Sequence, residues 1–298
     1  MYKSEKTIKE FYDRAVKVAK NFTNDYEIII VDDGSPDSSI EIAKQIQEQD
    51  KRVKIIEFTR NFGHHNALMA GTLAAQKDLV FIIDSDLEEA PEDFLILNKS
   101  MITEKVDIVL SQQKSRKGGF TESTIGGVFY KIFDVFSEKS INIPKDVLTS
   151  RLITSEVVNT LKKYQEYSLF YGGIMSDTGY NYCVVKLNKG FKGETTYTFS
   201  KRIKLLFESF SDFSFAPLKL IIFVGLIVFF LAFTFLVFVL VEKLFLSTGS
   251  FDGYVSIMLM LLFILSFQLL STGIVGYYIW KILLETKKRP RWVIRKED

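Results

Sequence analysis

The sequence predicts an α/β domain followed by a membrane hairpin, and three observations carry that prediction. Short apolar segments alternate with amphipathic ones over residues 1–200, two long apolar runs follow, and basic residues flank those runs. Such alternation is typical of a mainly parallel sheet with helices on both faces. The 298 residues contain one cysteine, Cys183, which excludes a disulfide framework. Their formal net charge is only +2, so the chain lacks the basic surplus of a nucleic-acid-binding protein. The only histidines, His64 and His65, are adjacent and make a poor pair of zinc ligands.

Helices and strands are expected to alternate along the α/β part. Segments with apolar residues at helical spacing are expected as helices, and short apolar runs bounded by polar turns as buried strands. The expected helices cover residues 6–20, 39–48, 66–75 and 92–100. The expected strands cover residues 27–31, 54–58, 79–83 and 107–110.

Two apolar runs in the last third of the chain are expected to span a membrane as helices. Residues 218–241 carry one charge, at Lys219, and residues 254–278 carry none, whereas about 20 apolar residues are enough to cross a bilayer. The alternative is a pair of buried core helices, but such helices are seldom apolar on every face over this length. Basic residues precede the first run and follow the second, so both termini are expected on the cytoplasmic side.

The segment between these two parts, residues 199–215, alternates basic and aromatic side chains. That composition suits a helix lying at a membrane surface, and packing onto the hairpin is the alternative. The expected organisation is an α/β domain, an amphipathic juxtamembrane helix, a two-helix transmembrane hairpin and a basic cytoplasmic tail. Their expected bounds are 1–198, 199–216, 217–284 and 285–298.

Paired carboxylates follow two of the expected strands. Asp32 and Asp33 follow the first strand, and Asp84 and Asp86 follow the third. Ligands of parallel sheets bind at the carboxyl ends of the strands. An Asp-x-Asp sequence there can hold Mg²⁺ or Mn²⁺ together with the phosphates of a nucleotide diphosphate, and the first pair can accept hydrogen bonds from a base or a ribose. One such sequence alone would more often be a solvated turn, but two favour a ligand site.

Three motifs in a fixed order carry a family resemblance: VDDGSPDSS at 31–39, RNFGHHNALMAG at 60–71 and DSDLEEAPED at 84–93, followed by the apolar runs and RPRWVI at 289–294. With them the chain resembles glycosyltransferase family 2. More narrowly, it resembles the bacterial polyprenyl-phosphate glycosyltransferases, such as bactoprenol glucosyltransferases, that are related to dolichol-phosphate mannosyltransferase. The resemblance extends over nearly the whole chain.

The resemblance implies an activity and a location. It implies a nucleotide-sugar-binding fold and inverting transfer of a hexose from a nucleotide diphosphate sugar, such as UDP-glucose, to undecaprenyl phosphate. It places that reaction at the cytoplasmic face of a bacterial inner membrane, where it feeds cell-surface glycan modification. The implied partners are the nucleotide sugar, the lipid phosphate, the membrane and further copies of the chain, with a tetramer favoured.

The resemblance also implies roles for individual residues. Asp86 is the expected metal ligand, and Arg151 is expected to meet the donor diphosphate or the acceptor phosphate; with Asp84 they are the expected catalytic residues. The expected nucleotide-sugar-binding residues are Val31, Asp32, Asp33, Asp84, Ser85 and Glu88. The expected acceptor-phosphate residues are Arg151, Thr196, Tyr197, Lys114 and Arg116.

The sequence departs from the family pattern at three places. The strand with which relatives begin, ending in Pro-x-Tyr-Asn-Glu, is not found, and Thr149 and Thr196 stand where many relatives have an acidic residue and a lysine. A second hypothesis is therefore a non-catalytic, membrane-associated degenerate transferase that lacks the first strand. The presence of Asp84, Asp86 and Arg151 favours the enzyme.

Overall fold

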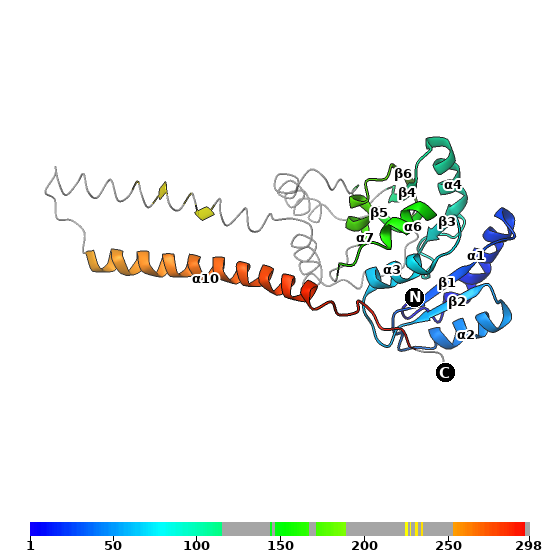
Figure 1. Ribbon diagram of the computed structural model, residues 1–298, viewed down its shortest axis with the longest axis horizontal. Helices are drawn as coiled ribbons and strands as arrows, with labels where there is room; N and C mark the ends of the chain where they lie inside the picture. Colours follow the sequence, from blue (N-terminus) through cyan, green and yellow to red (C-terminus); the bar gives the residue numbers. More distant parts are fainter. Residues whose placement is uncertain are drawn as a thin grey trace. The chain divides into compact units, whose positions relative to one another are not determined.

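The computed structural model describes residues 1–114, 144, 147–166, 171–188, 224–225, 227, 230–231, 234 and 253–295 (Figure 1). The chain divides into two compact units. The first unit comprises Met1–Thr124, Lys139–Thr198 and Arg289–Asp298, and the second comprises Ile125–Glu138 and Phe199–Lys288.

The first unit begins with a two-stranded parallel sheet. Strand β1 (Ile28–Asp32) pairs along its whole length with β2 (Val53–Glu57). Helices α1 (Ile8–Phe22) and α2 (Ser39–Gln49) pack on one face of this sheet, and α3 (His64–Ala74) packs on the other (Figure 1). The sheet is therefore covered on both faces, as the uninterrupted apolar run of β1 predicts.

Alternate residues of β1 pack into two different apolar clusters. Ile30 lies with Ile8 and Ala43, which belong to α1 and α2. Val31 lies with Ala67 and with other residues of the α3 face. Successive side chains of a strand point to opposite faces, so both clusters hold β1 in place and fix the position of the acidic residues at its end.

A second sheet has four strands in the order β3-β5-β4-β6. The strands are β3 (Leu79–Ile82), β4 (Ile108–Gln113), β5 (Val147–Thr154) and β6 (Tyr182–Leu187). Strand β5 is antiparallel to both of its neighbours, and β4 is parallel to β6. The α/β class is confirmed, but the prediction of one mainly parallel sheet is wrong. Strand β5 enters between β3 and β4 in the opposite direction, and the sequence reasoning did not include it.

The remaining helices of the first unit pack near this sheet. Helix α4 (Asp93–Glu104) contributes Leu97 and Met101 to the apolar cluster beneath it. Two short helices, α6 (Ser155–Leu161) and α7 (Tyr171–Asp177), follow β5. The four helices and four strands that the sequence predicted for the α/β part are present, with ends that differ by a few residues.

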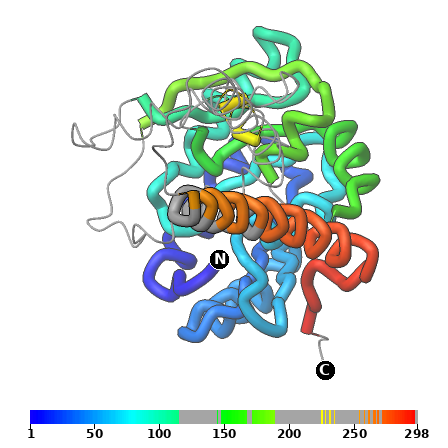
Figure 2. The backbone as a smooth tube through the Cα atoms, turned by 90° about the vertical axis from the view of Figure 1, so that its left-hand side faces the viewer, coloured from blue at the N-terminus to red at the C-terminus, as the bar shows by residue number. Residues whose placement is uncertain are grey.

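The second unit is described chiefly through helix α10 (Gly253–Thr286), drawn in orange and red in Figure 2. The second predicted membrane span, 254–278, lies within this helix, whereas most of the first, 218–241, lies outside the described residues. In the part of the chain that the structure describes, no helix meets the length and apolarity needed to cross a bilayer. That finding does not support a span at 254–278, and the span at 218–241 stays a prediction.

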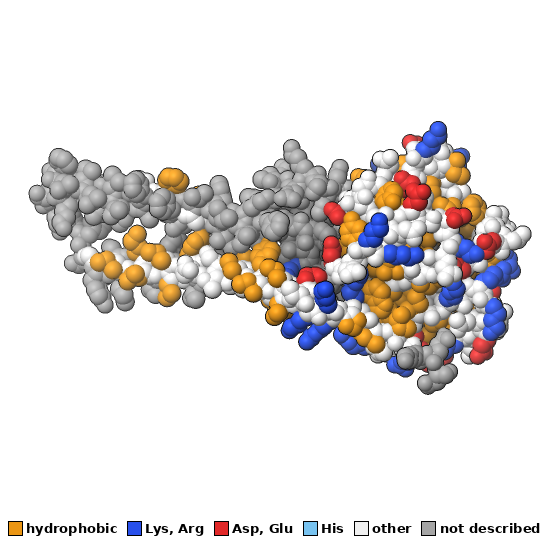
Figure 3. All heavy atoms as spheres, viewed as in Figure 1, with side chains coloured by type: hydrophobic (Ala, Val, Ile, Leu, Met, Phe, Trp, Pro, Cys, Tyr) orange, Lys and Arg blue, Asp and Glu red, His pale blue; other side chains and the backbone are white. Residues whose placement is uncertain are grey.

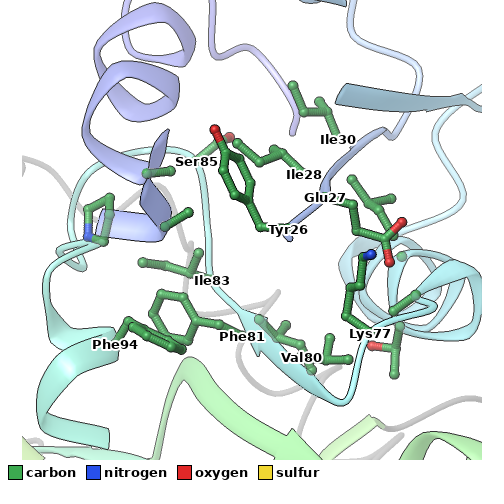
Figure 4. A pocket seen from close by; sticks show the side chains of 18 of the residues that line it. Tyr26, Glu27, Ile28, Ile30, Lys77, Val80, Phe81, Ile83, Ser85 and Phe94 are labelled. Atoms are coloured by element: carbon green, nitrogen blue, oxygen red, sulfur yellow. The ribbon is translucent and has the colours of Figure 1, made fainter. Parts of the chain in front are cut away.

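A cavity of about 510 Å³ lies between β1 and β3. Its lining includes Ile28–Val31 of β1 and every residue of β3, together with apolar residues of α1 and α3. Figure 4 shows Ile28 and Ile30 on one side of it and Val80, Phe81 and Ile83 on the other. Within the described residues, neither strand has a paired neighbour on its cavity side.

Met1 lies at one end of this cavity and pairs with the end of β1. Its amino group donates to the carbonyl oxygen of Val31 at 2.8 Å, and its carbonyl oxygen accepts from the N–H of Asp33 at 3.0 Å. A residue that bonds in this way to the two neighbours of Asp32 has the pairing of a parallel strand. Met1 therefore extends the β1–β2 sheet by a single residue on the side of the cavity.

Candidate functional site

Asp33 lies one residue beyond β1, and backbone N–H groups enclose its carboxylate. The N–H of Phe62 donates to Oδ1 at 2.6 Å, and the N–H of Gly63 donates to Oδ2 at 3.0 Å. Asp33 is only 4% exposed, and burial raises its pKa above the ordinary value. The two N–H donors oppose that shift because they stabilise the charged form. Each carboxylate oxygen has two lone pairs, so acceptor capacity remains for a ligand.

Asp32, the last residue of β1, shapes the turn that follows. Ser35 donates to it twice, from its N–H to Oδ2 at 3.0 Å and from its hydroxyl to Oδ1 at 2.5 Å. Both oxygens thus bond within the turn. The structure shows its carboxylate bonded to the turn next to Asp33, and its predicted place beside the nucleotide stays a prediction.

A close backbone approach brings the Phe62 loop against Asp33. Gly34 has a φ of +66°, and a Cβ atom there would lie 2.4 Å from the carbonyl carbon of Arg60. Only glycine combines this backbone conformation with so short a distance. The turn after β1 and the loop after β2 therefore touch, which is how Phe62 and Gly63 reach the Asp33 carboxylate.

The carboxylates that follow β3 are more open than those at β1. The Asp84 side chain is 35% exposed, and its Oδ1 lies 3.6 Å from Nδ1 of His64, the first residue of α3. Asp86 is half-buried and accepts the N–H of Glu88 at 3.0 Å. These two side chains are thus more exposed than those of Asp32 and Asp33.

The amino group of Met1 shows that the two strand ends converge. It is buried, and burial lowers its pKa from the ordinary value. Four nearby carboxylates act in the opposite direction and raise that pKa; they belong to Asp84, Asp32, Asp33 and Asp86. The two acidic strand ends therefore form one site around a buried amino group, as the sequence predicts for the carboxyl ends of strands in an α/β fold.

Arg151 lies in β5, opposite Ile82 of β3. It is 7% exposed, and its guanidinium donates to the carbonyl oxygens of Thr149 at 2.9 Å and Leu148 at 3.1 Å. The guanidinium also lies over the ring of Tyr171, 5.2 Å from its centre. Within the described residues its hydrogen bonds go to backbone carbonyls and none to a carboxylate.

Among the residues that the structure describes, Arg151 forms no ion pair, although Glu89 and Asp84 lie near it. Burial lowers the pKa of this guanidinium, and Tyr171, Glu89 and Asp84 oppose that shift. Removing a cation from water without a paired anion is costly. The position is therefore one where an anionic ligand next to Asp84 would gain from a nearby positive charge.

Glu89 supports the strand that carries Arg151, and sequence reasoning missed it. This side chain is 3% exposed, and its two oxygens accept the N–H groups of Thr149, at 3.0 Å, and Ser150. A buried carboxylate that accepts two N–H groups holds the backbone that supplies them in place. The acidic run at 88–93 contains this residue, but nothing in the sequence distinguishes it from the other acidic residues of the run.

The histidines of the RNFGHHN motif also adjoin the site, although the sequence analysis considered them only as zinc ligands. His65 is half-buried, and desolvation together with the nearby His64 and Arg151 lowers its pKa to about 4. It is therefore neutral at physiological pH. Within the described residues, no three side chains of His, Cys, Asp or Glu are grouped so as to hold a metal ion.

The predicted site residues are placed unequally by the structure. Val31 and the four aspartates adjoin the Met1 amino group, and the hydroxyl of Ser85 lies 3.1 Å from that of Ser4. Lys114 is exposed and follows β4. The other predicted acceptor-phosphate residues apart from Arg151 lie outside the described residues: Arg116, Thr196 and Tyr197.

Comparison with known proteins identifies the class of this fold and site. Residues 1–161 match glycosyl transferase family 2. The chain therefore belongs to that family, and the resemblance expected from its motifs is confirmed.

Three relatives match over almost the whole chain. The uncharacterized glycosyltransferase YkcC of Bacillus subtilis is 33% identical over 99% of this chain and 91% of its own length. The bactoprenol glucosyl transferase of Shigella phage SfV is 30% identical over 100% and 96%. The undecaprenyl-phosphate 4-deoxy-4-formamido-L-arabinose transferase of Proteus mirabilis is 27% identical over 99% and 91%. The chain is a glycosyltransferase, and these matches favour the enzyme over the non-catalytic alternative.

Proposed function

We propose that this glycosyltransferase moves a hexose from a nucleotide diphosphate sugar, such as UDP-glucose, to undecaprenyl phosphate. The observation that carries the donor half is the convergence of the two acidic strand ends around the Met1 amino group. The names of the relatives from Shigella phage SfV and Proteus mirabilis support the lipid acceptor. Their matches extend over the full chain, so they include the segments beyond the α/β domain.

The donor is assigned to the two strand ends in a fixed orientation. Asp33 retains acceptor capacity after bonding to Phe62 and Gly63, so it is assigned to the base or the ribose. Asp84 and Asp86 are more open and are assigned to the diphosphate end. The sugar would then lie toward Glu88 and Arg151.

A divalent cation fits the donor set at Asp84 and Asp86. Mg²⁺ prefers oxygen ligands and usually takes one or two carboxylates together with substrate phosphates. The two carboxylates after β3 supply that many ligands, and they lie near Asp32 and Asp33 around the Met1 amino group. Mg²⁺ or Mn²⁺ bound at Asp86 would offset the charge of the departing diphosphate.

Inversion follows from direct attack by the acceptor. A phosphate monoester is anionic at neutral pH, so its oxygen attacks the anomeric carbon while the bond from that carbon to the donor diphosphate breaks. No strong general base is needed, which fits Thr149 in place of an acidic residue. Holding nucleophile and anomeric carbon in line supplies up to ~7–11 kcal/mol of the barrier reduction. The Arg151 guanidinium is assigned the role of stabilising the negative charge that develops on a phosphate oxygen during transfer.

Membrane anchoring through 217–284, with both termini cytoplasmic in a bacterial inner membrane, is part of the proposal. Figure 3 shows hydrophobic side chains exposed along α10 and basic ones beyond its end. The exposed large side chains include Ile257, Leu261, Ile264, Leu265, Ile279 and Ile282. A helix with such a surface needs an apolar covering. Lipid and further copies of the chain, with a tetramer favoured, would provide it.

The test is transfer of labelled hexose from several nucleotide sugars by the full-length protein in vesicles containing undecaprenyl phosphate. Label is expected in the lipid fraction, with little transfer to undecaprenol, which lacks the phosphate, or to a soluble phosphate monoester. Transfer to the soluble acceptor alone would contradict the lipid assignment. Consumption of no nucleotide sugar would contradict the donor assignment as well.

A further inference from the structure

A short C-terminal segment, residues 291–295, lies against the edge of β2 that faces away from β1. We call it the C-terminal strap. Ile294 forms an antiparallel bridge with Phe58, the residue after β2. The N–H of Thr59 donates to the carbonyl oxygen of Val293 at 3.0 Å, and the N–H of Arg295 donates to that of Glu57 at 2.8 Å. The strap therefore adds a third, very short strand to the β1–β2 sheet.

Ion pairing and a further hydrogen bond hold the strap at both ends. Nε of Arg295 lies 3.1 Å from Oε1 of Glu57. At the other end, the guanidinium of Arg291 donates to the carbonyl oxygen of Tyr164 at 2.6 Å. A surface ion pair contributes little alone, but this one accompanies two backbone hydrogen bonds, at Val293 and Arg295. The bond from the Arg291 side chain lies on the other side of Trp292.

Trp292 is the strap side chain that packs into the domain. Its ring stacks on that of Phe58, with centroids 6.0 Å apart and planes inclined by 19°. Both rings belong to the apolar cluster that also holds Val31 of β1. By contrast, Val293 is 44% exposed and Ile294 is 50% exposed.

A continuous series of contacts leads from Trp292 to Asp33. The Phe58 ring meets Phe62 edge to face, with centroids 5.6 Å apart. The backbone N–H of Phe62 is the donor that bonds to the Asp33 carboxylate at 2.6 Å. Phe58 itself donates its N–H to the carbonyl oxygen of Asp32 at 2.9 Å. The position of Asp33 thus depends on an aromatic stack that the end of the chain completes.

We propose that the C-terminal strap is a positioning element for the donor site, and that Trp292 acts through Phe58 and Phe62 on Asp33. Trp292 touches no substrate in this assignment. The proposal rests on the proposed function only in taking Asp33 as the base- or ribose-side contact of the nucleotide. Its effect is expected to be largest at that end of the donor, because the aromatic stack ends at Phe62, whose N–H bonds to Asp33.

The test compares Trp292→Ala, Trp292→Phe and the matched strap control Val293→Ala in the full-length protein. Binding of uridine diphosphate and of inorganic diphosphate is measured by calorimetry with Mg²⁺ present. Aromatic pairs contribute about 0.5–1.5 kcal/mol beyond area burial. We therefore expect Trp292→Ala to lower the affinity for uridine diphosphate by up to about ten-fold. The affinity for inorganic diphosphate is expected to change less than two-fold. Trp292→Phe retains the stack and most of the affinity, and Val293→Ala matches the wild type.

Steady-state kinetics supply a second readout that a purely structural role would not move selectively. Trp292→Ala is expected to raise the donor KM while the acceptor KM and the kcat at saturating donor stay near the wild-type values. A variant that is merely less stable, with the affinity of its folded fraction unchanged, overturns the proposal. Equal weakening of uridine diphosphate and inorganic diphosphate also overturns it. Failure of the wild type to bind uridine diphosphate would instead contradict the proposed function.

Discussion

The two acidic strand ends differ in what their carboxylates already bind. At β1, Asp32 and Asp33 are 2% and 4% exposed, and each accepts hydrogen bonds from backbone N–H groups of a neighbouring turn or loop. At β3, the Asp84 side chain is 35% exposed and faces a histidine, and Asp86 is half-buried. The first pair is buried and hydrogen-bonded to neighbouring backbone, and the second pair is partly exposed to solvent.

This difference shows how one site can combine rigidly held carboxylates at β1 with carboxylates at β3 that can bind a cation. A carboxylate held by several N–H donors is fixed in direction and suits recognition of a base or a ribose. A more exposed carboxylate can offer lone pairs to a metal ion and phosphates. Substitutions at the two ends are therefore expected to have different consequences, and four predictions follow from the largest effect to the smallest.

Asp86→Asn is expected to have the largest effect on catalysis and little effect on folding. It removes one ligand charge from a half-buried position, and loss of one preorganised charged group typically costs ~10²–10³ in kcat. Transfer of labelled hexose to lipid is the measurement. Asp13→Asn, the same change on the exposed side of α1, is the control and should match the wild type. Activity of Asp86→Asn within two-fold of that control would remove Asp86 from the mechanism.

Asp33→Asn is expected to weaken donor binding and also to lower stability. Its amide NH₂ would face an N–H donor of Phe62 or Gly63, and an unsatisfied buried donor costs about 1–3 kcal/mol. Uridine diphosphate affinity, measured by calorimetry, should fall about ten-fold, and the midpoint of urea unfolding should fall as well. A stable variant with unchanged affinity would show that the backbone at the β1 end does not depend on this carboxylate.

Much of this arrangement could be predicted from the sequence, because strands that end in acidic residues bring those residues to one edge of an α/β fold. The order of helices and strands along the chain predicts that Asp33 and Asp84 lie near one another. The antiparallel strand β5 could not be predicted, since it carries Thr149, Ser150 and Arg151 in its middle and reads as polar. Its burial depends on pairing with β3 and β4, which lie far away in the sequence.

The supporting contacts of the site were also beyond sequence reasoning, for a related physical reason. The bonds from Phe62 to Asp33 and from Thr149 to Glu89 join residues separated by 29 and 60 positions. Neither partner shows a local pattern that reveals the other. Trp292 lies still further away, and its aromatic character alone does not indicate that it stacks on Phe58.

The cavity between β1 and β3 provides the third prediction. An apolar segment of about five residues, matching the length of β1, is added before Met1 so that it continues the parallel pairing of Met1. It should bond to the backbone groups of β1 that face away from β2, and burying its side chains should raise the free energy of unfolding by ~1–3 kcal/mol. Urea unfolding is the measurement.

A Gly-Ser extension of the same length is the control for that experiment. Both extensions convert the Met1 amino group to an amide, so the charge among the four aspartates changes equally in the two proteins. Equal stability of the two would show that the cavity does not accept a strand.

The smallest expected effect is a pH dependence that distinguishes the β1 end. Burial raises the pKa of Asp33 above 3.8 in the folded state, so the folded protein holds that proton more tightly than the unfolded chain does. The resulting stability is present below the unfolded pKa and is lost as pH rises through the folded pKa. The stability of the wild type relative to Asp33→Asn should therefore decline as pH rises from 3.8, as measured by urea unfolding. A difference independent of pH would contradict the raised pKa.

The central claim is that the two strand ends form one donor site, with the nucleotide at β1 and the metal-bound diphosphate at β3. Calorimetric titration of uridine diphosphate into the full-length wild type and Asp86→Asn, with Mg²⁺, with Mn²⁺ and with chelator, tests it most directly. The account predicts binding by the wild type that is strongly weakened by chelator, and weak binding by Asp86→Asn in all three conditions. Binding that is equally tight with chelator, or unchanged in Asp86→Asn, would contradict the claim.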